Sequence, residues 1–111
     1  MVASNPLKKL EQEYILLILQ YLHLNPRGKT FSQISAAIEH NPNPKQVRSS
    51  IHTLTEIGLI FQLQAEADMD TLYVLSNRGR YASEIVWDLF RIILNPHDAY
   101  PDDKDILDFY R

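Results

Sequence analysis

The stretch HTLTEIGLIF, residues 52–61, contains the signal that decides the fold. Apolar side chains precede Gly58 at Val47, Ile51 and Leu54, first four and then three residues apart. We call this set the apolar stripe. This spacing is typical of one face of a helix. Glycine ends many helices because it adopts the left-handed conformation without the penalty of a Cβ atom. From Leu59 onward the residues alternate with a period of two, so the stretch predicts the end of a helix and the start of a strand.

Asparagine–proline pairs divide the rest of the chain into helices. Asparagine is a good N-cap, and proline suits the first helical position because its missing N–H needs no partner there. The first pair predicts a helix from Pro6 to about Leu24, and the pair at residues 43–44 predicts the helix over 44–57. The pair at residues 95–96 ends the last helix.

A capping box starts the short second helix. The Thr30 hydroxyl caps the N–H of Gln33, and the Gln33 side chain reaches back to Thr30. We therefore expect a helix over residues 31–40. Residues 41–43 alone separate it from the next helix, which is the tight spacing of a helix-turn-helix.

Two short strands follow and flank residues 65–70, so they predict a β-hairpin with a loop. The second strand covers residues 72–75, and SNRG, residues 76–79, opens a last helix from about Gly79 to Leu94. The fold class is therefore mainly α with a small β-hairpin, in the order helix, helix, helix, hairpin, helix.

Two motifs are separated by about the length of a β-hairpin. They are VRSSIHTLTEIGLI, residues 47–60, and YVLSNRGR, residues 73–80. Together they resemble the recognition helix and wing end of the winged helix-turn-helix domains of bacterial and archaeal transcription regulators, of the broad MarR, PadR and ArsR kind. Ser76 replaces the usual threonine and keeps a capping hydroxyl. The resemblance implies a winged helix-turn-helix (α-α-α-β-β-α) over residues 5–95. An acidic C-terminal tail over 96–111 follows.

The resemblance also implies a transcription regulator that binds double-stranded DNA, with the helix over 44–57 reading the major groove. Arginine suits guanine edges and glutamine suits adenine edges. The candidate base contacts opposite the apolar stripe are Lys45, Gln46, Arg48, Ser49 and His52. The candidate phosphate contacts are Arg27, Lys29, Arg78 and Arg80. The alternative is a solvated helix face, on which polar residues need no explanation.

Charge is unevenly spread along the chain. The net charge is −3, and residues 98–111 alone hold five aspartates against two basic residues, which also gives −3. The hairpin loop, residues 65–70, adds three carboxylates where family wings often carry arginine or lysine. Carboxylates repel phosphates. A second interpretation therefore stays open: a protein-interaction module whose acidic wing and tail contact a basic partner.

Two predicted helices carry more apolar surface than a small monomer buries. Eight of nine residues over 14–22 and eight of ten over 85–94 are apolar or aromatic, and large unpaired apolar faces usually mark interfaces. We expect a homodimer through the first and last helices, at Tyr14, Leu17, Tyr21, Ile85, Trp87, Leu89 and Ile92. The alternative is a monomer in which a short docking helix of the tail covers the excess with Ile106, Leu107, Phe109 and Tyr110.

Composition excludes several classes of site. The chain has no cysteine, which excludes disulfides and thiolate metal ligands. Its three glycines cannot build a Walker or dinucleotide-binding loop. The sequence therefore predicts no enzyme, no metal site and no cofactor.

The longest apolar run, residues 14–19, is far shorter than the ~18 residues of a membrane span, and no signal peptide is visible. We expect a cytoplasmic protein.

Overall fold

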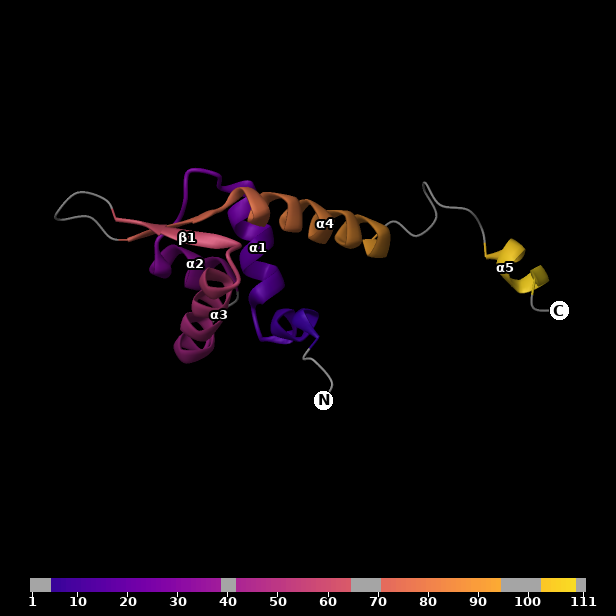
Figure 1. Ribbon diagram of the computed structural model, residues 1–111, viewed down its shortest axis with the longest axis horizontal. Helices are drawn as coiled ribbons and strands as arrows, with labels where there is room; N and C mark the ends of the chain where they lie inside the picture. The colour runs from indigo at the N-terminus through magenta and orange to yellow at the C-terminus, as the bar shows by residue number, and fades with distance from the viewer. Residues whose placement is uncertain (1–4, 39–41, 65–70, 95–102, 110–111) are drawn as a thin grey trace.

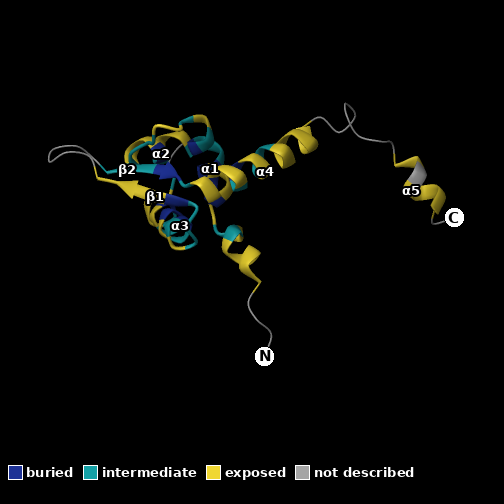
Figure 2. Ribbon diagram, turned by 45° about the horizontal axis from the view of Figure 1, so that its top comes forward, coloured by how far each residue is buried: buried dark blue, intermediate teal, exposed yellow. Residues whose placement is uncertain are grey.

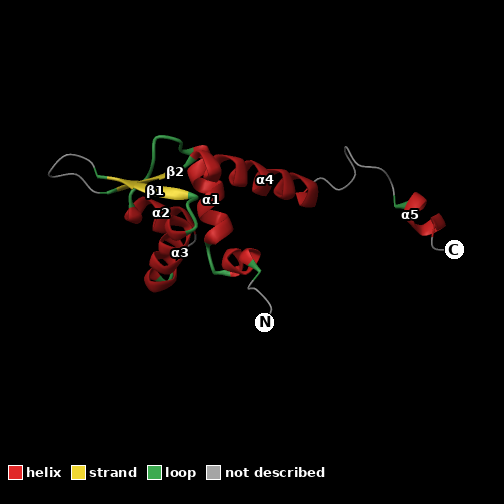
Figure 3. Cartoon of the chain, in the orientation of Figure 1, coloured by secondary structure: helices red, strands yellow, loops and turns green. Residues whose placement is uncertain are grey.

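A computed structural model of the chain describes residues 5–38, 42–64, 71–94 and 103–109. Helices pack around a two-stranded antiparallel hairpin in the predicted order (Figures 1 and 3). The elements are a 3₁₀ helix η1 (Pro6–Glu11), α1 (Ile15–Leu24), α2 (Phe31–Ile38), α3 (Pro44–Glu56), β1 (Ile60–Leu63), β2 (Leu72–Leu75), α4 (Asn77–Leu94) and α5 (Lys104–Phe109). The predicted end of the second helix, at His40, lies outside the described residues.

The first predicted helix is wrong as a single element. It is interrupted between η1 and α1, where Tyr14 has a left-handed φ of 71°. The buried Ser50 hydroxyl of α3 donates a hydrogen bond to the carbonyl of Glu13 at this interruption. An unbroken helix would direct that carbonyl along its own axis, and Ser50 would lose its acceptor. Because buried polar groups need hydrogen-bond partners, the contact with α3 favours the break.

The core forms where α1 meets α2, α3 and the hairpin (Figure 2). Four side chains of α1 are fully buried: Ile15, Ile18, Leu19 and Leu22. Ile34 of α2 and Ile60 of β1 are also buried. The predicted apolar stripe of α3 is confirmed, because Val47, Ile51 and Leu54 all lie in this core.

Gly58 ends α3 as the sequence predicts. Its φ is 81°, in the left-handed region. Its N–H donates to the Thr55 carbonyl at 3.1 Å, and the N–H of Leu59 donates to the Leu54 carbonyl at 3.0 Å. These are the two hydrogen bonds of a Schellman motif. They satisfy carbonyls at the helix end while the chain turns into β1.

Ser76 connects this turn to α4. Its hydroxyl donates to the Gly58 carbonyl at 2.6 Å and accepts from the Gly79 N–H at 3.0 Å, which confirms the predicted capping role. Because Ser76 is the cap, α4 begins at Asn77 rather than near Gly79. A Cβ atom at Gly79 would stand 1.9 Å from the carbonyl oxygen of Leu59. The start of α4 therefore contacts the turn through backbone atoms.

The hairpin is widened by one bridge from the loop between α1 and α2. Lys29 and Tyr73 exchange two backbone hydrogen bonds, at 3.1 and 2.8 Å. Gln62 of β1 is the other partner of Tyr73. Directly opposed residues leave a sheet on the same face, so Lys29, Tyr73 and Gln62 share one face. The predicted acidic loop, residues 65–70, lies outside the described residues.

The helix of the tail does not cover apolar surface of α1 or α4. Ile106, Leu107 and Phe109 of α5 are all exposed, and Tyr110 lies outside the described residues. Within the described ranges, none of the helices has both the length and the apolar character needed to cross a membrane. Nor do three potential metal-ligating side chains gather in that part of the chain.

Candidate nucleic-acid interface

α3 forms a ridge between two surface hollows. The wing-side hollow, of about 390 Å³, is lined by Phe31, Arg48, Ile51, His52, Thr55, Gln62 and Tyr73. The η1-side hollow, of about 420 Å³, is lined by Lys8, Lys9, Glu11, Gln12, Thr53 and Glu56. A helix with a hollow along each side can enter a groove of a duplex.

The structure places the five candidate base contacts on the outer surface of α3. Lys45, Arg48 and His52 are exposed, and Gln46 and Ser49 are half-buried. They come together because their spacing puts them opposite the buried stripe. The prediction that they contact bases stays a prediction.

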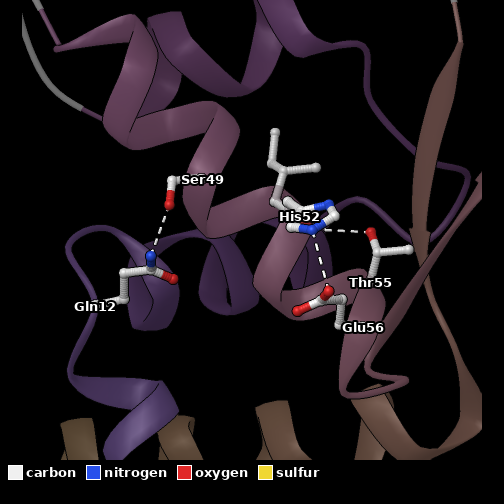
Figure 4. Close-up of polar contacts among 6 residues, drawn as sticks. Gln12, Ser49, His52, Thr55 and Glu56 are labelled. Carbon is white, nitrogen blue, oxygen red and sulfur yellow. Dashed lines mark hydrogen bonds and ion pairs between the residues drawn. The ribbon is translucent and has the colours of Figure 1, made fainter.

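Two of these side chains have polar protein partners (Figure 4). Gln12 Nε2, from the turn before α1, donates to Ser49 Oγ at 2.7 Å. His52 Nε2 lies 3.1 Å from Glu56 Oε1, one helical turn further along α3. Both His52 and Glu56 are exposed, so this contact is screened by solvent and contributes little to stability. These contacts hold Ser49 and His52 in defined positions on the ridge.

Arg48 lies over the ring of Phe31, the first residue of α2. Its guanidinium carbon lies 4.9 Å from the centroid of the Phe31 ring. A guanidinium stacked on a ring still has its N–H donors free in its own plane. Phe31 therefore restrains Arg48 and leaves its hydrogen-bonding edge available. No local signal reveals this pair, because its members belong to different helices.

The four candidate phosphate contacts do not form one cluster. Arg78 lies beside Gly58, with Nη1 3.5 Å from the place a Cβ would take there. Arg78 is therefore placed at the C-terminal end of α3. Arg80 lines a separate hollow of about 150 Å³ with residues of α1. Lys29 lies beside the wing, and Arg27 is exposed in the preceding loop.

Several residues around α3 are absent from the sequence prediction. Besides Phe31, the wing-side hollow includes Thr55, Gln62 and Tyr73. A further hollow, of about 250 Å³, is lined by Thr30, Phe31, Ser32, Thr71 and Tyr73. These residues come from four elements and the loops beside them, so only the pairing of β1 with β2 and the packing of α2 bring them together.

The apolar surface predicted for a dimer is partly present. Ile85, Leu89 and Ile92 are exposed on α4, and Leu17 is exposed on α1. Tyr21 and Trp87 are half-buried. In Figure 1 the C-terminal half of α4 extends beyond α1, which leaves this surface open.

Tyr14 is wrong as an interface residue. It is 8% exposed and belongs to the hydrophobic core. Its hydroxyl accepts a hydrogen bond from the Asn43 N–H at 3.4 Å. The break before α1 explains this position, because the left-handed backbone of Tyr14 turns its side chain inward rather than along the outer face of a continuous helix.

No protein-family model and no curated protein matches this chain, but solved structures do. A possible HxlR-family transcriptional factor from Thermoplasma volcanium superposes with a TM-score of 0.71 at 21% identity, covering 83% of this chain and 84% of that one. The chain has a winged helix-turn-helix fold. In these terms α2 and α3 are the helix-turn-helix, and β1 and β2 are the wing.

Two further similar structures are transcription regulators or homologues of them. A transcriptional regulator homologue from Pyrococcus horikoshii has a TM-score of 0.65 at 21% identity, covering 82% of this chain and 89% of its own. MepR from Staphylococcus aureus, a regulator of a multidrug efflux pump, has a TM-score of 0.66 at 18% identity, covering 93% and 78%. A MepR variant was solved bound to an oligodeoxyribonucleotide, and MepR was also solved bound to ethidium bromide.

Proposed function

We propose that this chain is a transcription regulator that binds double-stranded DNA at specific sequences, with α3 in the major groove. The observation that carries the proposal is the ridge: the second helix of a helix-turn-helix stands between two hollows with a polar outer face. The major groove admits a helix of this kind. The oligodeoxyribonucleotide complex of a MepR variant supports the same use of the fold.

The proposed base contacts are Lys45, Gln46, Arg48, Ser49 and His52, and the proposed phosphate contacts are Arg27, Lys29, Arg78 and Arg80. Among these, Arg48 is restrained by the Phe31 ring, over which its guanidinium lies. A planar, prepositioned guanidinium suits bidentate pairing with a guanine edge.

The test is binding to duplex DNA over a salt series. Wild type should bind at low salt, and the logarithm of its affinity should fall linearly with the logarithm of salt concentration. Replacing Lys45 and Arg48, two proposed base contacts, together with glutamine should weaken binding, since a good base contact is worth about 1–3 kcal/mol. The matched control removes two positive charges elsewhere, with Arg91→Gln and Lys104→Gln. Absence of binding by wild type at low salt would contradict the proposal.

We also propose that the regulator acts as a homodimer through α1 and α4. The exposed apolar residues of α4, with Ile85 at 68% exposure, support this, because a small monomer rarely leaves so continuous an apolar face in water. A two-fold dimer would present two copies of α3 to a palindromic site. Sedimentation at micromolar concentration should detect a dimer, and a single 12.9 kDa species would refute it.

A second candidate function is a protein-interaction module that uses the acidic wing and tail. The observation that favours it is the outer face of the wing, where Phe61 and Leu63 are exposed just before the acidic loop. Such a surface suits a partner with apolar and basic side chains. The same salt series decides between the two candidates, because this one predicts no duplex binding at any salt concentration. Both candidates are cytoplasmic binding proteins without a catalytic role.

A further inference from the structure

We propose that the root of the wing, rather than its tip, binds the sugar-phosphate backbone of one DNA strand. The site is a trough made of two hollows, of about 390 and 250 Å³, that share Phe31 and Tyr73 in their lining. The trough lies between α3 and the start of α2 on one side and the strands of the wing on the other. The inference rests on the proposed DNA binding and adds the path of one strand.

Neutral hydrogen-bond donors line this trough. Ser32, Thr71 and Tyr73 contribute hydroxyl groups, and Gln62 contributes an amide. Hydroxyl and amide side chains are common partners of phosphate oxygens. Among the described residues that line either hollow, none is an aspartate or a glutamate. A phosphate in the trough would therefore meet hydrogen-bond donors among the described lining residues, while the Glu56 carboxylate lies 3.1 Å from the lining residue His52.

Two cations accompany these donors. The Arg48 guanidinium lies over Phe31, a ring that both hollows share. Lys29 is the bridge partner of Tyr73 and leaves the sheet on the same face. A strand of DNA in the trough would thus pass close to Lys29 and the neutral donors, while Arg48 on α3 is the residue proposed to reach the bases.

The hollow on the other side of α3 is unsuited to phosphates. Lys8 and Lys9 line it, but Glu11 and Glu56 line it as well, so its formal charges cancel. A helix in the major groove has one backbone on each side. The difference in charge between the two hollows assigns the closer backbone contact to the wing side. It also shows how a wing with an acidic loop sequence can serve DNA binding, since its root carries the donors.

The experiment measures affinity and salt dependence separately on a mixed-sequence duplex, with the full chain. Thr71→Val and Tyr73→Phe together remove two hydroxyl groups and keep both side-chain shapes. The dissociation constant should rise roughly 5- to 100-fold, as expected for two hydrogen bonds. The salt slope should stay unchanged, because neutral donors neutralise no phosphate charge. Lys29→Gln should instead make the slope shallower by about 0.9.

The matched control is Tyr81→Phe, which removes one phenolic hydroxyl group from α4 at a residue that is 72% exposed and is not among the lining residues of either hollow. It should bind as wild type does, and all variants should show wild-type circular dichroism and melting. Wild-type affinity in the Thr71→Val, Tyr73→Phe variant, or an equal loss in Tyr81→Phe, would overturn this inference alone. Failure of wild type to bind duplex at low salt would overturn the proposed function and this inference with it.

Discussion

Replacing Ser76 with alanine should destabilise the fold by about 1–3 kcal/mol. The hydroxyl caps α4 through the Gly79 N–H at 3.0 Å, and loss of such a cap costs about 0.5–2 kcal/mol. It also donates to the Gly58 carbonyl at 2.6 Å, a hydrogen bond worth about 0.5–1.5 kcal/mol net. The two contributions add because one side chain makes both contacts.

Urea unfolding followed by circular dichroism measures this loss. With an m-value of about 1–3 kcal/mol/M, the midpoint should fall by about 1 M. All samples need the same protein concentration, because a dimer makes apparent stability depend on it. The stability of Ser76→Gly should lie between those of the alanine variant and wild type, since glycine is an acceptable N-cap but cannot donate a hydrogen bond to the Gly58 carbonyl. Ser76→Thr keeps the hydroxyl and should restore stability. An alanine variant within about 0.5 kcal/mol of wild type, or a threonine variant as unstable as alanine, would refute the reasoning.

Three further predictions concern packing, assembly and DNA contact. Gly79→Ala places a Cβ against the Leu59 carbonyl oxygen, so thermal melting should show a loss of about 3 kcal/mol or more; wild-type stability would contradict the close contact. Leu89→Glu puts a charge on the exposed face of α4, so sedimentation should show at least about tenfold weaker dimerisation with an unchanged fold; an unchanged dimer would exclude this face. In a double-mutant cycle for DNA binding, Phe31→Leu and Arg48→Gln should couple by about 0.5–1 kcal/mol, and additive effects would mean that Phe31 does not position Arg48.

The features that the sequence predicts correctly depend on residues close together in the chain. Thr30 and Gln33 form their capping box, with hydrogen bonds of 3.0 and 3.2 Å. Gly58 and Ser76 act as a helix end and a helix start. Each signal involves a turn or a cap whose geometry is set within three or four residues. The stripe of α3 is predictable for a similar reason, because helical periodicity fixes which side chains share a face.

The features that the sequence does not predict depend on contacts between distant segments. The break before α1 follows from the bond between Ser50 and the Glu13 carbonyl, which no local pattern encodes. The stacking of Arg48 on Phe31 needs the crossing of α2 and α3. The trough at the wing needs the register that sets Tyr73 opposite Lys29 and Gln62. In each case the residues are ordinary in sequence, and their chemistry arises only from their new neighbours.

The backbone contact at Gly79 has a consequence for the geometry of an assembly. Side chains can change rotamer and so make a packed contact adjustable, but the start of α4 meets the turn after α3 through backbone atoms, with Gly79 against the Leu59 carbonyl. The angle between these two helices is then fixed by peptide geometry. In the proposed dimer, α4 joins the subunits and α3 contacts DNA, so the distance between the two half-sites would be set by how the α4 helices pair. A regulator built this way would change its operator spacing through the outer residues of α4, while the angle between α3 and α4 stays constant.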